Sequence, residues 1–88
     1  MKIQIEKPDA QKLEELGVKN WPIWEHGVDT FPWHYDMTEV CFILEGKVKV
    51  KTDEGVVEFG KGDLVTFPKG LSCEWQVEEP VRKHYTFR

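Results

Sequence analysis

One carboxylate, Glu39, stands at the start of the apolar run Val40–Leu44 and is the side chain best placed to do chemistry. Side chains of a strand alternate between its two faces, so an extended chain puts Glu39 on the same face as Cys41 and Ile43. A carboxylate among apolar groups has its pKa raised by desolvation unless it is paired, and can then act as a general acid or base near neutral pH. We also keep a structural alternative, in which Tyr35 or a backbone amide holds Glu39 by a hydrogen bond.

The two cysteines are the next candidates for chemistry. Each is predicted to be a free thiol, because two Cys do not make a disulfide framework. Cys73 shares a strand face with Trp75, and it becomes a nucleophile only if a neighbour lowers the pKa of its thiol. No His or Lys close in the sequence does so, and a buried, inert thiol is the simpler expectation for Cys73 and for Cys41. Whether His84 faces an interior stays open.

The elements that position these residues are predicted to be mainly strands. Asp9 is an N-cap for a helix over residues 10–16, and Gly17 supplies the C-terminal stop. Elsewhere, short apolar or alternating runs are separated by Gly-rich turns, which is typical of a β-sandwich or β-barrel. The predicted strands cover residues 3–5, 31–35, 38–44, 47–51, 56–59, 64–67, 72–77 and 81–87.

Length and composition bound the remaining possibilities. The chain has 88 residues, which fits one domain over residues 1–88 and leaves no room for a second. A formal net charge of −4 argues against nucleic-acid binding as the main function. No apolar run approaches the roughly 20 residues of a membrane span. The sequence does not begin with the apolar segment of a signal peptide, so a cytoplasmic protein is predicted.

The run Val40–Leu44 is apolar on both faces. If one face points into a barrel, the other, which carries Val40, Phe42 and Leu44, also needs cover. The helix, the Trp21–Trp24 segment or a second subunit could supply it. We favour a second subunit and therefore predict a homodimer.

The spacing of the punctuating residues resembles the first motif of cupins, a family of small β-barrels. That motif is a Gly, a His-x-His pair, a Glu and a second Gly at fixed separations. The sequence has Gly27, Trp33–Tyr35, Glu39 and Gly46 in the same register.

The second cupin motif, a Gly, a Pro-x-Gly turn, a His and an Asn, also has a counterpart. Here the corresponding residues are Gly62, Pro68–Gly70, Cys73 and Val77. The resemblance implies an all-β fold, a single cupin or RmlC-like jelly-roll β-barrel with one short N-terminal helix.

Further stretches narrow the resemblance to very small single-barrel cupins of bacteria and plants. These are Phe31–Trp33, Ile43–Val48, Gly62–Val65 with Phe67–Gly70, and Lys83–Tyr85. This subgroup is grouped by sequence with the barrel domains of (S)-ureidoglycine aminohydrolase, whose larger members act on ureido compounds and use manganese. For the small members the resemblance implies the fold and no particular activity.

In the cupin pattern a metal is held by two His and the Glu of the first motif and by the His of the second. Those positions are here Trp33, Tyr35, Glu39 and Cys73, while His34 points to the opposite strand face. A neutral indole does not bind a metal, and Tyr binds only as phenolate, with an ordinary pKa near 10. Too few of the usual three or four ligands remain, so we expect no metal and no cofactor. The alternative is a zinc or iron site formed by Tyr35, Glu39 and Cys73.

The resulting hypothesis is a cupin that binds an unidentified small molecule in its barrel without a metal, and without nucleic-acid or membrane partners. Whether it is an enzyme stays open, with Glu39 and Tyr35 as the acid–base or anchoring groups. The alternatives are a metalloenzyme resembling ureidoglycine aminohydrolase with an altered ligand set, and a non-catalytic dimeric protein-interaction module. The predicted pocket residues are Trp33, Tyr35, Glu39, Cys41, Cys73 and Trp75.

Overall fold

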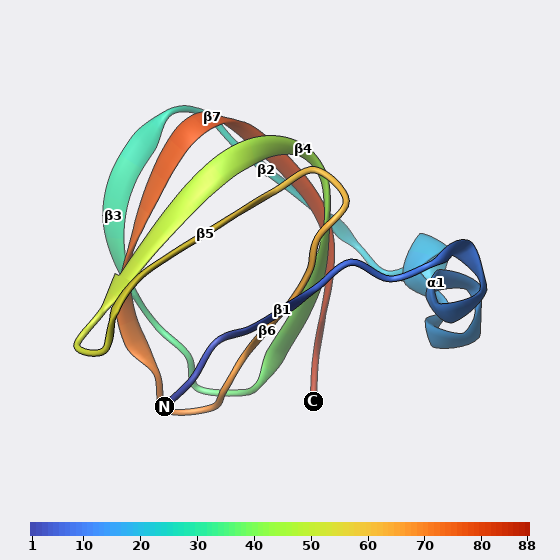
Figure 1. Cartoon of the computed structure of the whole chain (residues 1–88), viewed down its shortest axis with the longest axis horizontal. Coiled ribbons are helices and arrows are strands. Elements are labelled where there is room, and N and C mark those ends of the chain that lie inside the picture. The colour runs from blue at the N-terminus through green and yellow to red at the C-terminus, as the bar shows by residue number, and fades with distance from the viewer.

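The computed structural model describes the whole chain, residues 1–88, and consists of seven strands, one α-helix and one 3-10 helix. The strands curl around a common interior, and the α-helix lies to one side of them (Figure 1). In chain order the elements are β1 (Gln4–Glu6), α1 (Ala10–Leu16), η1 (Val18–Asn20), β2 (Ile23–His26), β3 (Asp29–His34), β4 (Glu39–Thr52), β5 (Gly55–Gly60), β6 (Leu64–Phe67) and β7 (Ser72–Phe87).

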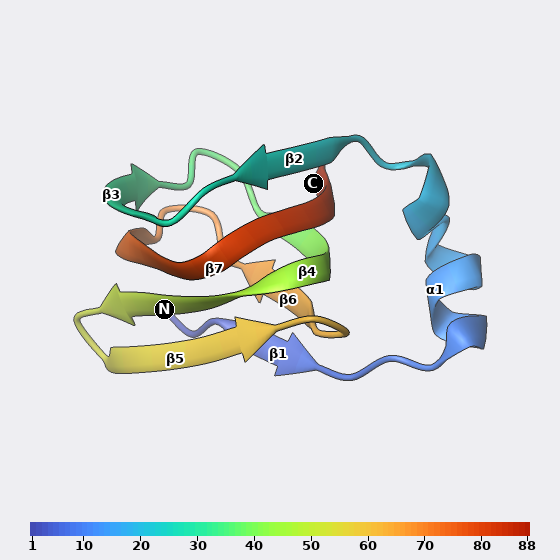
Figure 2. The same cartoon turned by 90° about the horizontal axis from the view of Figure 1, so that it is seen from above.

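Helix α1 begins and ends where the sequence predicts. The carboxylate of Asp9 accepts a hydrogen bond of 2.9 Å from the backbone N–H of Lys12, which caps the first turn. Gly17 ends the helix with a φ of 71°, a left-handed conformation that favours glycine. No residue of α1 is fully buried, and Figure 2 shows the helix beyond the end of the strands. Neither helix has the length and apolar character that a membrane crossing requires.

All strand pairs are antiparallel and belong to one sheet, with the main order β1-β6-β4-β7-β2. β5 pairs with β4 and β3 pairs with β7. The central strands β4 and β7 are long enough to meet different neighbours along their two halves, and they also pair with each other. The sheet therefore wraps into a barrel whose wall is built mainly from β4 and β7 (Figure 1).

β4 and β7 each run without interruption, where the sequence predicts two shorter strands separated by a turn. Gly46 and Pro80, which interrupt the strand pattern in the sequence, meet where the register of the β4–β7 ladder shifts. A Cβ on Gly46 would lie 2.5 Å from the carbonyl oxygen of Pro80, so only glycine permits this approach. Such a bulge bends a strand without ending it, and both strands continue around the barrel.

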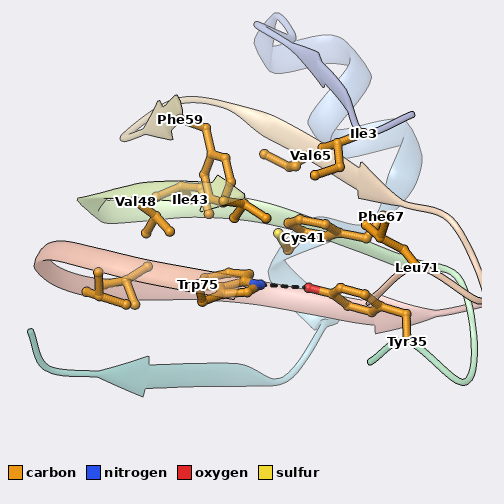
Figure 3. Close-up of a cluster of buried hydrophobic side chains, with 13 residues drawn as sticks. Ile3, Tyr35, Cys41, Ile43, Val48, Phe59, Val65, Phe67, Leu71 and Trp75 are labelled. Atoms are coloured by element: carbon orange, nitrogen blue, oxygen red, sulfur yellow. Dashed lines mark hydrogen bonds between the residues drawn. The ribbon is translucent and has the colours of Figure 1, made fainter. Parts of the chain in front are cut away.

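The barrel interior is filled by apolar and aromatic side chains. Trp75, Tyr35 and Phe67 are among the largest fully buried residues, and Figure 3 shows them between the strands. The Trp75 ring contacts Phe59 and Phe67 with 5.6 Å between ring centroids in each case. Large buried aromatic surfaces let a short chain close a core. This all-β barrel with one short helix confirms the predicted fold class.

The outer face of β4 is partly covered within the single chain. Val40 is only 2% exposed, while Phe42 and Leu44 are half-buried. The segment after η1 lies along the neighbouring strand β7, where the backbone N–H of Tyr85 donates to the Pro22 carbonyl at 3.0 Å. This segment pairs with the edge of β7, and its cover of the outer β4 face stays a prediction. The homodimer stays a prediction.

Candidate functional site

A pocket of about 240 Å³ opens into the barrel, with aromatic walls and two charged side chains. Its lining comes from β2, β3, β4 and β7, together with Tyr35 just after β3. Apolar walls around a few polar groups are typical of small-molecule sites. The lining residues are Trp24, Phe31, Trp33, Tyr35, Glu39, Trp75, Lys83, Tyr85 and Phe87.

The two charges form a buried ion pair. Lys83 Nζ lies 2.6 Å from Glu39 Oε2, and both side chains are only 6% exposed. The pairing of β4 with β7 places Lys83 opposite Ile43, which lies on the same face of β4 as Glu39, so Lys83 points into the barrel as Glu39 does. Removing two charges from water costs several kcal/mol per ion, and the pair persists only because its geometry is close. The expected carboxylate among aromatic groups is therefore present, but it is paired.

Two indole rings hold the ammonium group of Lys83. Nζ lies 4.8 Å from the ring centroid of Trp24 and 4.6 Å from that of Trp75. Trp24 is the direct cross-strand neighbour of Lys83 in the β2–β7 ladder. A cation over an indole face is attracted by the ring quadrupole, more strongly when water is excluded. Lys83 is thus fixed by one carboxylate and two aromatic faces.

Tyr35 supplies a neutral hydroxyl to the same pocket. Its ring stacks on Phe67 at 4.8 Å, and its oxygen accepts a 3.1 Å hydrogen bond from Trp75 Nε1 (Figure 3). Burial, together with the negative charge of Glu39, raises the pKa of Tyr35 above its ordinary value, so the phenol stays protonated. Its proton has no acceptor among the hydrogen bonds of the structure. The hydroxyl is therefore available to donate to a ligand.

The turn Pro68–Gly70 positions Tyr35. The backbone N–H of Gly70 donates to the Tyr35 carbonyl at 2.7 Å, and the Tyr35 N–H donates to the Leu71 carbonyl at 2.9 Å. Gly70 has a φ of 90°, which an L side chain rarely adopts. The two spaced sequence motifs thus meet here, because the turn of the second fixes a pocket residue of the first.

Of the six predicted pocket residues, the structure brings Trp33, Tyr35, Glu39 and Trp75 together in the lining. The two cysteines lie outside it. Cys41 is completely buried in the core, and burial raises its thiol pKa to about 12. Cys73 is half-buried against that core, and burial together with the charge of Glu39 raises its thiol pKa to about 11.

The donor set does not fit a metal ion. No three His, Cys, Asp or Glu side chains come close enough to share one. The carboxylate of Glu39 is bound by the Lys83 ammonium, the phenol of Tyr35 is protonated, and Cys73 lies outside the pocket lining. The alternative site of Tyr35, Glu39 and Cys73 would require all three groups to change partner or protonation state.

The histidines lie outside the pocket. His34 is exposed and points away from the interior, as expected, with Nδ1 2.7 Å from Ser72 Oγ. His84 Nδ1–H donates to the Trp21 carbonyl at 2.9 Å. Because its neighbours Lys83 and Tyr85 line the pocket, His84 faces the outside of the barrel.

Sequence reasoning did not predict the pocket residues Lys83, Trp24, Phe31, Tyr85 and Phe87. A signal for Lys83 existed, because alternation along the last strand puts it on one face with Tyr85 and Phe87. A carboxylate predicted to be buried also needs a partner, and a lysine in that register is a candidate. The missing step was the pairing of β4 with β7, which joins residues 44 positions apart.

An antiparallel barrel that carries the two spaced motifs and contains a pocket defines the chain as a cupin. The chain belongs to the family of EutQ-like cupin domains, whose sequence profile matches residues 13–85. No curated protein matches the sequence. The narrower resemblance to the ureidoglycine aminohydrolase grouping stays a prediction.

Several crystal structures are similar to this chain. A DUF861 family protein from Thermotoga maritima is 58% identical, with a TM-score of 0.96, and the match covers 99% of this chain and 100% of that one. The EutQ protein of Clostridium difficile is 25% identical, with a TM-score of 0.69 over 74% of this chain and 52% of its own. A putative ethanolamine utilization protein Q from Salmonella typhimurium is 28% identical, with a TM-score of 0.68 over 74% of this chain and 53% of its own. This chain spans about half the length of these two proteins.

Proposed function

We propose that this cupin binds a small organic molecule in the barrel pocket without a metal, with Glu39, Lys83 and Tyr35 as its polar anchors. The buried Glu39–Lys83 ion pair inside an aromatic pocket is the observation that carries the proposal. A buried ion pair is weak evidence for stability, because well-packed apolar residues often replace such a pair at no loss. Charged groups kept in a pocket favour a function there.

The polar groups retain bonding capacity for a ligand. Glu39 Oε1 makes no hydrogen bond within the protein, and no fully buried side-chain polar atom lacks a partner. Oε1 is therefore not sealed in the core and can accept from a ligand. The Tyr35 hydroxyl can donate, and the indole faces can stack. The volume of about 240 Å³ lies below the roughly 300–1,000 Å³ of drug-sized sites, which favours a metabolite-sized ligand.

The two alternatives have less support. A metalloenzyme resembling ureidoglycine aminohydrolase would need a metal at Glu39, and the Lys83 ammonium bound to Oε2 would place a positive charge beside that metal. A dimeric protein-interaction module accounts for exposed apolar residues such as Val28 and Met37, but it does not account for a charged pair inside the barrel. A cytoplasmic setting remains part of the proposal, supported by two free cysteines.

Tryptophan fluorescence tests the proposal, because three of the four Trp residues line the pocket and Trp21 does not. The probes are individual small carboxylic acids, amines, amino acids, ureido compounds, sugars, aldehydes and ketones at millimolar concentration. A ligand should change the emission and raise the unfolding midpoint. Both effects should be weaker in Trp75→Phe, and the matched control Trp21→Phe should keep them unchanged.

Two results would contradict the proposal. One is that no probe class changes the emission, or that Trp75→Phe and Trp21→Phe respond alike. The other is stoichiometric metal in the purified protein that disappears on Glu39→Ala, which would favour the metalloenzyme.

A further inference from the structure

Lys83 differs from the other lysines of the chain in its surroundings. Its side chain is 6% exposed, whereas the ion-paired Lys7, Lys12, Lys47 and Lys49 are 40–78% exposed. It is also the one lysine that lines the aromatic pocket. Desolvation in an apolar pocket is one of the ways in which a lysine becomes a nucleophile.

We propose that Lys83 is a nucleophile that forms an imine with the carbonyl carbon of a small aldehyde or ketone bound in the pocket. This inference rests on the proposed function, because the carbonyl compound is then the molecule that the pocket takes. The aromatic walls favour an apolar or aromatic body on the carbonyl compound, and the Tyr35 hydroxyl has a proton for its oxygen.

Glu39 is placed to take the proton that keeps the amine unreactive. Lys83 Nζ and Glu39 Oε2 are 2.6 Å apart, so a proton passes from ammonium to carboxylate without a water molecule. This transfer turns two buried charges into none. A ligand that displaces water from the pocket favours the neutral pair, since desolvation penalises charged forms.

The reaction balances without an oxidant or reductant. The Lys83 ammonium gives one proton to Glu39, and the free amine attacks the carbonyl carbon to form a C–N bond. A proton moves from nitrogen to the former carbonyl oxygen, which gives a neutral carbinolamine. Glu39 then returns its proton to this hydroxyl, the C–O bond breaks and water leaves. A protonated imine remains on Lys83.

The product suits the site as well as the reactant does. The protonated imine carries one positive charge at Nζ, as the ammonium group did. It therefore keeps its attraction to the Glu39 carboxylate and to the faces of Trp24 and Trp75, which lie 4.8 and 4.6 Å away. The pocket thus stabilises both the ammonium group of the reactant and the protonated imine of the product.

The test is reductive trapping with benzaldehyde and sodium cyanoborohydride, followed by peptide mapping of the wild-type protein by mass spectrometry. Lys83 should acquire the benzyl group at least ten times faster than Lys49, a matched lysine that is also ion-paired but 40% exposed. Labelling of Lys83 that is no faster than labelling of Lys49 would overturn the inference. Because the comparison is made within one wild-type chain, it does not depend on whether a variant folds.

Two variants define the roles of the pair. Glu39→Gln should slow labelling of Lys83 and leave labelling of Lys49 unchanged, which a general loss of structure would not do. Lys83→Arg should remove the fast label. If benzaldehyde changes the tryptophan emission but Lys83 is not labelled, the imine is wrong and the proposed function stands. If a different probe class binds, and benzaldehyde neither changes the tryptophan emission nor labels Lys83, the imine is likewise wrong.

Discussion

At the level of single residues, the central feature is the ion pair of the barrel pocket. The carboxylate of Glu39, which belongs to the first cupin-like motif, binds the positive charge of Lys83. In the cupin pattern that the sequence resembles, the same carboxylate holds a metal. An ammonium group is a fixed part of the chain, so the charge of the pocket does not depend on metal supply. It also offers a nucleophilic nitrogen in place of a Lewis acid.

The first prediction concerns the stability of this pair. Glu39→Gln or Lys83→Met leaves a buried charge without its partner, and each is expected to lower the free energy of unfolding by about 3–5 kcal/mol. The double variant removes both charges and should be more stable than either single variant. Urea denaturation measures all three.

The control for this prediction is the exposed pair Lys49–Glu78, whose atoms are 3.4 Å apart. Lys49→Met should change the free energy of unfolding by less than about 1 kcal/mol. If the double variant at positions 39 and 83 loses the sum of the two single losses, the residues are not coupled and the prediction is wrong.

The second prediction concerns thiol reactivity. Burial and the charge of Glu39 raise the pKa of Cys73 to about 11, so the reactive thiolate is scarce at pH 8. Alkylation of Cys73 by iodoacetamide should be roughly 100-fold slower than that of a cysteine with an ordinary pKa near 8.5, and should speed up as pH rises. Cys41, with a pKa of about 12 and no exposure, should react only in denaturant. Equal native labelling of the two cysteines would contradict this prediction.

Several site residues could be predicted from local rules. Alternation and motif spacing indicated Trp33, Tyr35, Glu39 and Trp75, because each rule acts within one strand. Alternation also puts Lys83 on the face of Tyr85 and Phe87, but it could not show that Lys83 meets Glu39, since that contact depends on which distant strands become neighbours. Alternation placed the cysteines inward, but it could not show that they pack in the core and outside the pocket lining.

At the level of elements, the bulge between β4 and β7 decides the shape of the barrel wall. Helix α1 and strand β6 were predicted with their observed bounds, because helix caps and turns depend on residues that are adjacent in the sequence. The two long strands were each predicted as a pair of strands. Considered alone, Gly46 and Pro80 each indicate the end of a strand. In the folded barrel they lie against each other across the β4–β7 ladder, where they form a single bulge and both strands continue.

The third prediction tests this meeting with two glycines of similar conformation. Gly46 and Gly55 have φ values of 108° and 123°, but a Cβ would meet the Pro80 backbone at the first and nothing within 4 Å at the second. Gly55→Ala should cost about 1–3 kcal/mol through backbone strain alone. Gly46→Ala should cost a further ~1–3 kcal/mol through the steric clash. Equal losses in thermal or urea unfolding would mean that the close approach is relaxed easily.

At the level of the whole molecule, the apolar outer face of β4 bears on association. Phe42 and Leu44 remain half-buried in the single chain. The predicted homodimer would complete their burial, and the barrel pocket would not take part in the interface.

The fourth prediction is that sedimentation velocity finds a dimer and that Leu44→Glu converts it to a monomer, because a charge buried in an apolar interface is costly. Val56→Glu is the matched control, since Val56 is 57% exposed on β5. It should leave the dimer intact. A monomeric wild-type protein would show that the homodimer prediction is wrong.

The position of β7 in the chain has a consequence for how the protein is made. β2 and β3 pair with no other strand than β7, and β4 pairs with it along most of its length. A growing chain therefore presents these strands with unpaired edges until residues 72–87 emerge from the ribosome. Folding that depends on such distant partners is slow, and exposed edges promote aggregation. The barrel is thus expected to form in one late step rather than progressively during synthesis, so that any product that stops before β7 has no folded state.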